Sequence, residues 1–94
     1  MADEHPEHPK HQESDAIGRV SHYYSHLSVA AVSLEAPLRV GDRIHIKGHT
    51  TDLVQPVESL EVDHKPVERA VPGDDVAMKV TDHVREHDKI YLEE

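Results

Sequence analysis

The chain contains the same short unit three times, and this repetition limits the fold more than any other feature. Each unit is a tight turn, an aspartate and then a run of alternating apolar and polar residues: Gly41-Asp42 before 43–47, Gly73-Asp74 before 76–80, and His87-Asp88 before 89–92. Glycine tolerates positive φ, and the short aspartate side chain hydrogen-bonds to nearby backbone. The alternation that follows is typical of a strand with one buried face. The pattern therefore predicts a small all-β protein.

Further strands are predicted between these units. They cover residues 16–24, 27–34 and a long bent segment, 52–63, that contains Pro56. Gly18 inside the first strand predicts a bulge or the close approach of another backbone, and Pro56 predicts an edge or a bulge. No segment shows helical periodicity over three turns, so the pattern favours a β-barrel over residues 16–94.

Residues 1–15 are polar and lack apolar periodicity, so we expect a disordered tail before the barrel domain. His5, His8 and His11 recur at every third residue, a spacing with which a flexible segment could hold Zn²⁺ or Ni²⁺. The simpler interpretation is a solubilising tail without a metal.

Composition excludes several classes of protein. The 94 residues include no Cys, Trp or Phe, which excludes disulfides and thiolate metal sites. The formal net charge of −9 disfavours general nucleic-acid binding. We expect no membrane span and no signal peptide, because long apolar runs are absent, and therefore a cytoplasmic protein. The ten histidines allow a pH-sensing hypothesis, although solvated surface histidines are the simpler explanation.

The segment after the middle unit concentrates chemically active side chains. Lys47 is followed after one glycine by His49, Thr50, Thr51 and Asp52. A nucleophilic threonine with a histidine base is disfavoured, because neighbouring residues in one turn rarely reach the geometry of a catalytic triad. The alternatives are a turn in which the side chains cap backbone N–H groups, and a contact surface for a partner.

Two adjacent tyrosines and one arginine complete the candidate partner-binding set. Tyr23 and Tyr24 should point to opposite faces of a strand, so one should fill the core and the other should contact a partner. The sequence leaves open which is which. Arg43 lies on the polar face of the strand that ends at Lys47.

The ordered set of segments 17–20, 38–44 and 71–78 resembles the second domain of translational GTPases such as elongation factor Tu. This resemblance implies a closed six-stranded Greek-key β-barrel. A closer likeness is to stand-alone elongation-factor-like proteins and to the C-terminal barrel of collagenase-like peptidases, which carry segments similar to 46–52 and 57–62. The chain has no phosphate-binding loop, so GTP binding and hydrolysis are not expected.

The resemblance implies a non-enzymatic binding module that contacts a protein or ribonucleoprotein partner, with a role in translation. The acidity favours a protein partner over RNA. One alternative is an accessory subunit of a separately encoded collagenase-like peptidase. Another is a histidine-based metal or pH sensor. We expect no cofactor in any of these cases.

Overall fold

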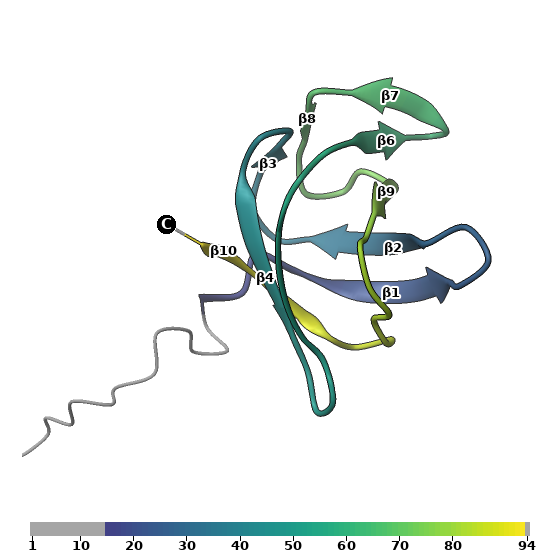
Figure 1. The fold of residues 1–94 in the computed structure, drawn as a ribbon. Coiled ribbons are helices and arrows are strands. Elements are labelled where there is room, and N and C mark those ends of the chain that lie inside the picture. Colours follow the sequence, from purple (N-terminus) through teal and green to yellow (C-terminus); the bar gives the residue numbers. More distant parts are fainter. Residues whose placement is uncertain (1–14, 94) are drawn as a thin grey trace, which may run out of the picture.

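The computed structural model describes residues 15–93, and every regular element in that range is a β-strand. Figure 1 shows these strands curling around a single core. The ten strands are β1 (Gly18–Tyr24), β2 (Val29–Leu34), β3 (Leu38–Arg39), β4 (Arg43–Lys47), β5 (Asp52–Pro56), β6 (Leu60–Val62), β7 (Lys65–Val67), β8 (Arg69–Ala70), β9 (Val76–Lys79) and β10 (Lys89–Glu93). The all-β prediction is therefore confirmed, and no helix long and apolar enough to cross a membrane occurs in the range described.

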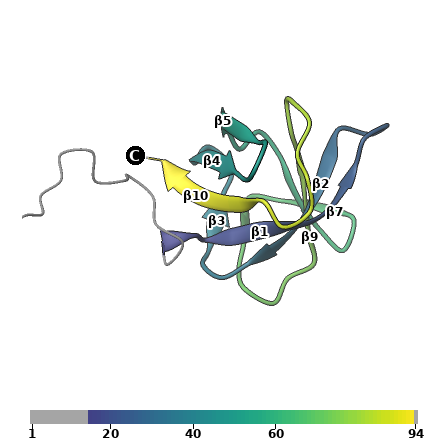
Figure 2. The same cartoon turned by 90° about the horizontal axis from the view of Figure 1, so that it is seen from below.

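Eight strands form one continuous antiparallel sheet in the order β5-β4-β10-β1-β2-β9-β6-β7, and β3 pairs with β8 in a separate small sheet. A second view shows β10 lying between β4 and β1 (Figure 2). The prediction of a closed six-stranded Greek-key barrel is not confirmed, because β5 and β7 are the two edges of an open, curled sheet. Both edge strands carry a proline, Pro56 in β5 and Pro66 in β7, and proline cannot donate a ladder hydrogen bond.

A buried side-chain amide bridges the open side of the curled sheet. Gln55 on β5 is 3% exposed and donates from Nε2 to the Lys79 carbonyl at 3.0 Å. Its Oε1 accepts from the Thr81 backbone N–H at 2.9 Å and from the Thr81 hydroxyl at 3.2 Å. The Gln55 amide thus hydrogen-bonds to the end of β9 as the backbone of a paired strand would. This side chain connects the edge strand β5 to β9, with which β5 has no backbone pairing.

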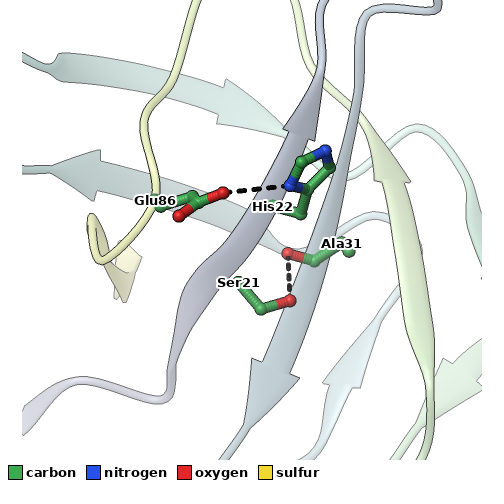
Figure 3. Close-up of polar contacts among 4 residues, drawn as sticks. All are labelled: Ser21, His22, Ala31 and Glu86. Carbon is green, nitrogen blue, oxygen red and sulfur yellow. Dashed lines mark hydrogen bonds and ion pairs between the residues drawn. The ribbon is translucent and has the colours of Figure 1, made fainter.

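The core is aliphatic and comes from the inward-facing residues of the strands. Its largest fully buried side chains include Leu38, Ile44, Ile46, Leu60, Met78 and Ile90. Gly18 confirms the predicted close approach, because an added Cβ would lie 2.7 Å from the Ser33 carbonyl oxygen. β1 also contains a bulge, where the register with β2 shifts between Val20 and His22. The residue in between, Ser21, donates its hydroxyl to the Ala31 carbonyl at 3.1 Å (Figure 3).

The three turn-aspartate units have the same hydrogen bonds. Gly41, Gly73 and His87 all have positive φ, at 99°, 95° and 77°. The aspartate after each one accepts a backbone N–H from three residues earlier, through pairs Arg39–Asp42 at 3.0 Å, Val71–Asp74 at 2.9 Å and Arg85–Asp88 at 2.8 Å. Each aspartate N–H also donates to the carbonyl of that earlier residue at 3.1 Å. The repeat seen in the sequence is therefore a real structural repeat.

Candidate protein-binding groove

A polar groove of about 400 Å³ lies between the tip of the β4–β5 hairpin and the loop that joins β9 to β10. We call it the polar groove. Its lining residues are Thr50, Thr51, Asp52, Leu53, Asp82, His83 and Arg85. The hairpin therefore contributes two hydroxyls and a carboxylate, and the loop contributes a carboxylate, an imidazole and a guanidinium.

The hairpin wall of the polar groove is held by a backbone hydrogen bond within the hairpin loop and by close packing against Asp88. The Gly48 N–H donates to the Thr51 carbonyl at 2.9 Å, and Thr51 is only 6% exposed. A Cβ at Gly48 would collide with the Asp88 carboxylate, so the third turn unit packs directly against the loop of the β4–β5 hairpin. A larger residue at position 48 would have to displace the Asp88 carboxylate, which accepts the Arg85 N–H.

The loop wall of the polar groove, formed by Asp82, His83 and Arg85, is held by core packing, a ring contact and hydrogen bonds. Val84 is fully buried, and the Asp88 carboxylate accepts the Arg85 N–H at the C-terminal end of the loop. The His83 ring meets the edge of the Tyr23 ring with centroids 4.7 Å apart, and its backbone N–H donates to Asp82 Oδ1 at 2.7 Å. Packing and hydrogen bonds thus fix the backbone that carries the polar side chains.

An imidazole–carboxylate pair sets the charge at the hairpin side. His45 Nε2 lies 2.5 Å from Asp52 Oδ1, with side chains 13% and 70% exposed. The hydrogen bond with His45 and its electrostatic interaction with that ring lower the pKa of Asp52 below 3.8, and Lys47 adds a smaller effect in the same direction. Asp52 therefore stays ionised under mildly acidic conditions.

The groove does not contain a catalytic triad among the described residues. Asp52 pairs with His45, and neither Thr50 nor Thr51 has a hydrogen bond to a histidine. The expected capping of turn N–H groups by these side chains is also not observed, since the Asp52 carboxylate is bound to His45. No group of three or more potential ligands arranged to hold a metal ion occurs in residues 15–93.

The structure brings together only part of the predicted set. Thr50, Thr51 and Asp52 line the polar groove, whereas His49 lies at the hairpin tip outside the lining. Arg43 and Lys47 are exposed on β4, on either side of His45. The histidines of the N-terminal segment, His5, His8 and His11, lie outside the described residues.

The structure shows which of the two tyrosines packs against the core. Tyr23 packs against the core and supports His83, whereas Tyr24 is 41% exposed and lies away from the polar groove. Tyr23 thus acts on the groove from behind, through a ring contact.

Four lining residues were not predicted: Leu53 beside the predicted cluster, and Asp82, His83 and Arg85 in the loop between β9 and β10. The last three lie some 30 residues after the hairpin, and their own segment has no strand pattern. One signal could have found them. The third turn unit leads into β10, and β10 pairs with β4. Because of this pairing, the loop before His87 lies beside the β4–β5 hairpin.

Comparisons with known proteins were made on the whole chain. No known family model matches it. An uncharacterised protease of Methanocaldococcus jannaschii is 44% identical over 77 residues, which are 81% of this chain and 19% of the relative. A collagenase of Porphyromonas gingivalis is 36% identical over 77 residues, which are 80% of this chain and 21% of the relative. The chain thus spans about a fifth of the length of the curated relatives it matches.

Two solved structures share the fold. Both are of the C-terminal domain of a Geobacillus thermoleovorans protein described as a U32 peptidase. One has a TM-score of 0.81 at 19% identity and covers 92% of this chain and all of that domain. The other, its selenomethionine variant, has a TM-score of 0.76 at 20% identity over 81% of this chain and 96% of that domain. At this identity the likeness establishes the fold alone.

These findings separate the two resemblances given by the sequence. The likeness to the C-terminal barrel of collagenase-like peptidases is supported. The expectation of a translation-factor role, drawn from elongation factor Tu, is wrong, because the relatives are a protease and collagenases and the solved neighbours are a peptidase domain. Generic strand and Gly-Asp turn patterns carried that expectation, and such patterns report a type of fold without reporting a function.

Proposed function

We propose that this chain is a non-enzymatic binding domain that acts with a collagenase-like peptidase and contacts polypeptide through the polar groove. The observation that carries this proposal is the extent of the similarity. The 77 aligned residues are four-fifths of this chain but only a fifth of each relative, so the peptidases contain this module as one part of a longer chain. About four-fifths of each relative lies outside this module and can contain the catalytic domain.

The chemistry of the groove supports a polypeptide as the molecule that binds there. Arg85 can donate to carbonyl or carboxylate oxygens, and Asp52 and Asp82 can accept from N–H groups. The hydroxyls of Thr50 and Thr51 can do both. A peptide backbone alternates donors with acceptors, so it is well matched to a groove that carries both kinds of group.

The absence of a hydrogen-bonded nucleophile and base in the groove, among residues 15–93, supports a non-enzymatic role. A nucleophile needs a base within about 3 Å and a third group that orients the base. The His45–Asp52 pair supplies a base with its orienting carboxylate, but Thr51 is buried and neither threonine is hydrogen-bonded to His45. We therefore assign the peptidase activity to a partner chain or to another domain.

Calorimetric titration tests this proposal. The chain is titrated into the purified catalytic portion of a collagenase-like peptidase from the same organism, and hydrolysis of a denatured collagen substrate is followed with and without the chain. We expect saturable binding, no hydrolysis by the chain alone, and a loss of affinity of about 10-fold in Arg85→Ala, corresponding to about 1.4 kcal/mol. The matched control, Arg19→Ala, removes an exposed arginine outside the groove and should bind normally.

Two results would contradict the proposal. Hydrolysis by the chain alone would show that it is an enzyme. Equal affinity for the Arg85→Ala variant and the parent chain would show that the polar groove is not the contact surface.

A further inference from the structure

The outer face of β2, β9 and β6 forms a second surface that the polar groove does not use. Its floor consists of the apolar residues Tyr24, Leu27, Val29, Ala31 and Ala77, and it is hollowed to about 510 Å³. Its rim consists of Glu61, Asp63, His64 and Asp75. We call this surface the acidic face. Figure 1 shows that the β1–β2 and β6–β7 hairpins project to the same side of the molecule.

Small residues create the hollow at the centre of the acidic face. Ala31 on β2 is paired with Ala77 on β9, and Ala77 is paired in turn with Glu61 on β6. Two alanines side by side leave a depression between larger neighbours, because only a methyl group stands above the sheet at each position. Leu27 at one end is 55% exposed, so the depression has an apolar wall in contact with solvent.

The exposed tyrosine at this end is held in place before any partner arrives. The Tyr24 ring meets the His22 ring edge with centroids 4.4 Å apart. The His22 Nδ1 lies 3.0 Å from Glu86 Oε2, as Figure 3 shows. An exposed aromatic ring that is already ordered loses less conformational freedom on binding, which is the usual advantage of a preorganised contact residue.

The rim carries one sign of charge. Glu61, Asp63 and Asp75 have no hydrogen-bond or ion-pair partner for their carboxylates within residues 15–93. Three solvated carboxylates around an apolar floor attract a group that carries positive charge beside an apolar side chain. An anionic lipid surface or a nucleic acid would be repelled by the same rim.

The β6–β7 turn brings two side chains to the rim. Its two central residues, Asp63 and His64, have φ of 53° and 66°. A two-residue hairpin turn with positive φ at both positions favours Asn, Asp and Gly, and Asp and His adopt positive φ more readily than most other side chains. The turn therefore presents both side chains at the rim of the acidic face.

We propose that the acidic face is a docking surface for a protein segment in which an apolar side chain is flanked by lysine or arginine. The apolar side chain enters the depression over Ala31 and Ala77, and the flanking cations lie against Asp63, Asp75 and Glu61. This inference does not depend on the proposed peptidase association, since it concerns a different surface and is tested without a peptidase.

The test uses three capped hexapeptides as probes: Lys-Lys-Leu-Leu-Lys-Lys, Glu-Glu-Leu-Leu-Glu-Glu and Lys-Lys-Ser-Ser-Lys-Lys. Binding to the full chain is measured by calorimetry and by amide chemical shifts. We expect only the first peptide to bind, with shift changes at Ala31, Ala77 and Asp63. Absence of binding up to about 1 mM, or equal binding of the acidic peptide, would overturn the proposal.

Variants then locate the site. The double variant Asp63→Lys/Asp75→Lys should weaken binding by about 10-fold or more, whereas Glu35→Lys/Glu68→Lys, which changes the net charge equally at exposed positions outside this face, should weaken it by less than about 3-fold. An equal loss in both double variants would show general charge attraction and overturn the assignment.

Two further measurements separate binding from folding and from self-association. Asp63→Gly removes a carboxylate but keeps a residue that accepts positive φ, so it should change the melting temperature little while it weakens peptide binding. Unchanged peptide affinity in Asp63→Gly would count against a role for the rim. Sedimentation of the parent chain should show a monomer, and a dimer that disappears in Leu27→Ser would show that a second copy is the occupant and overturn the proposal.

Discussion

The polar groove and the acidic face occupy different parts of one small sheet, and they differ in both charge and construction. The polar groove combines carboxylates with a guanidinium and an imidazole, and it is formed by two loops from distant parts of the chain. The acidic face has an apolar floor with carboxylates around it, and it is formed mainly by the outward side of adjacent strands. The two surfaces therefore suit different ligands, one of mixed polarity and one both apolar and basic.

The difference in construction has a thermodynamic consequence. Buried polar bonds, above all those of Gln55 and Asp88, hold the walls of the polar groove in place. The rim carboxylates of the acidic face make no such bonds with any residue from 15 to 93. Substitutions in the frame of the polar groove should thus lower the stability of the fold, whereas rim substitutions should change binding alone.

The largest effect on stability is expected at Gly48, in the loop of the β4–β5 hairpin. Gly48→Val should lower the free energy of unfolding by about 3 kcal/mol, because its side chain would need the volume that the Asp88 carboxylate fills. Urea denaturation measures this. Gly41→Ala is the comparison, since a Cβ there meets no atom within 4 Å and only its positive φ opposes the change, at about 1–2 kcal/mol. Equal losses would show that Asp88 does not constrain position 48.

The amide of Gln55 should come next. Gln55→Leu keeps the size of the side chain but leaves the Lys79 carbonyl and the Thr81 N–H without their partner, and we expect a loss of about 2 kcal/mol. Amide exchange should accelerate at Thr81 before it does so in β2. Glu58→Leu, at an exposed neighbouring position, should change stability by less than about 0.5 kcal/mol. A similar small change in Gln55→Leu would mean that the open side of the sheet does not need this bridge.

Charge reversal on the acidic face should have little effect on folding. Asp63→Lys/Asp75→Lys should change the free energy of unfolding by less than about 1 kcal/mol, since both side chains are exposed and unpaired in the described chain. Thermal denaturation at low and at high salt measures this. A loss as large as that of Gln55→Leu would remove the distinction between the two surfaces.

The smallest effect concerns the titration of Asp52. Its pKa is lowered in the folded chain, so its contribution to stability is present above the unfolded value near 3.8 and is lost as the pH falls through the folded value. Carboxyl-carbon NMR titration should give a pKa below 3.8, and His45→Gln should return it toward 3.8. An unchanged pKa in His45→Gln would show that His45 is not the cause.

Much of the fold could be predicted because its signals are local. Residues 43–47 form β4 as predicted, and His87 has the positive φ of the glycines that it replaces in the repeat. The predicted strand 52–63 is two strands, β5 and β6, because the chain leaves the sheet after Pro56. The two-residue strands β3 and β8 were missed, since two residues are too few for an alternation to appear.

The site was harder to predict because it depends on tertiary contacts. The sequence identified Thr50, Thr51 and Asp52 as a cluster. It did not identify His45 as the partner of Asp52, because the register between β4 and β5 brings these two residues together. His83 and Arg85 come from a loop without a motif. The sequence also could not show whether the barrel closes. Closure requires that β5 pairs with a second strand, whereas in this structure β5 reaches β9 only through the side chain of Gln55.

The central claim is that the chain binds a peptidase partner through the polar groove. Hydrogen–deuterium exchange of the chain, alone and with the catalytic portion of a collagenase-like peptidase, tests this directly. The account predicts slower exchange on complex formation at residues 50–53 and 82–85, with the strands of the acidic face unchanged. Slower exchange confined to other segments, or no change in residues 50–53 and 82–85 under saturating partner, would contradict it.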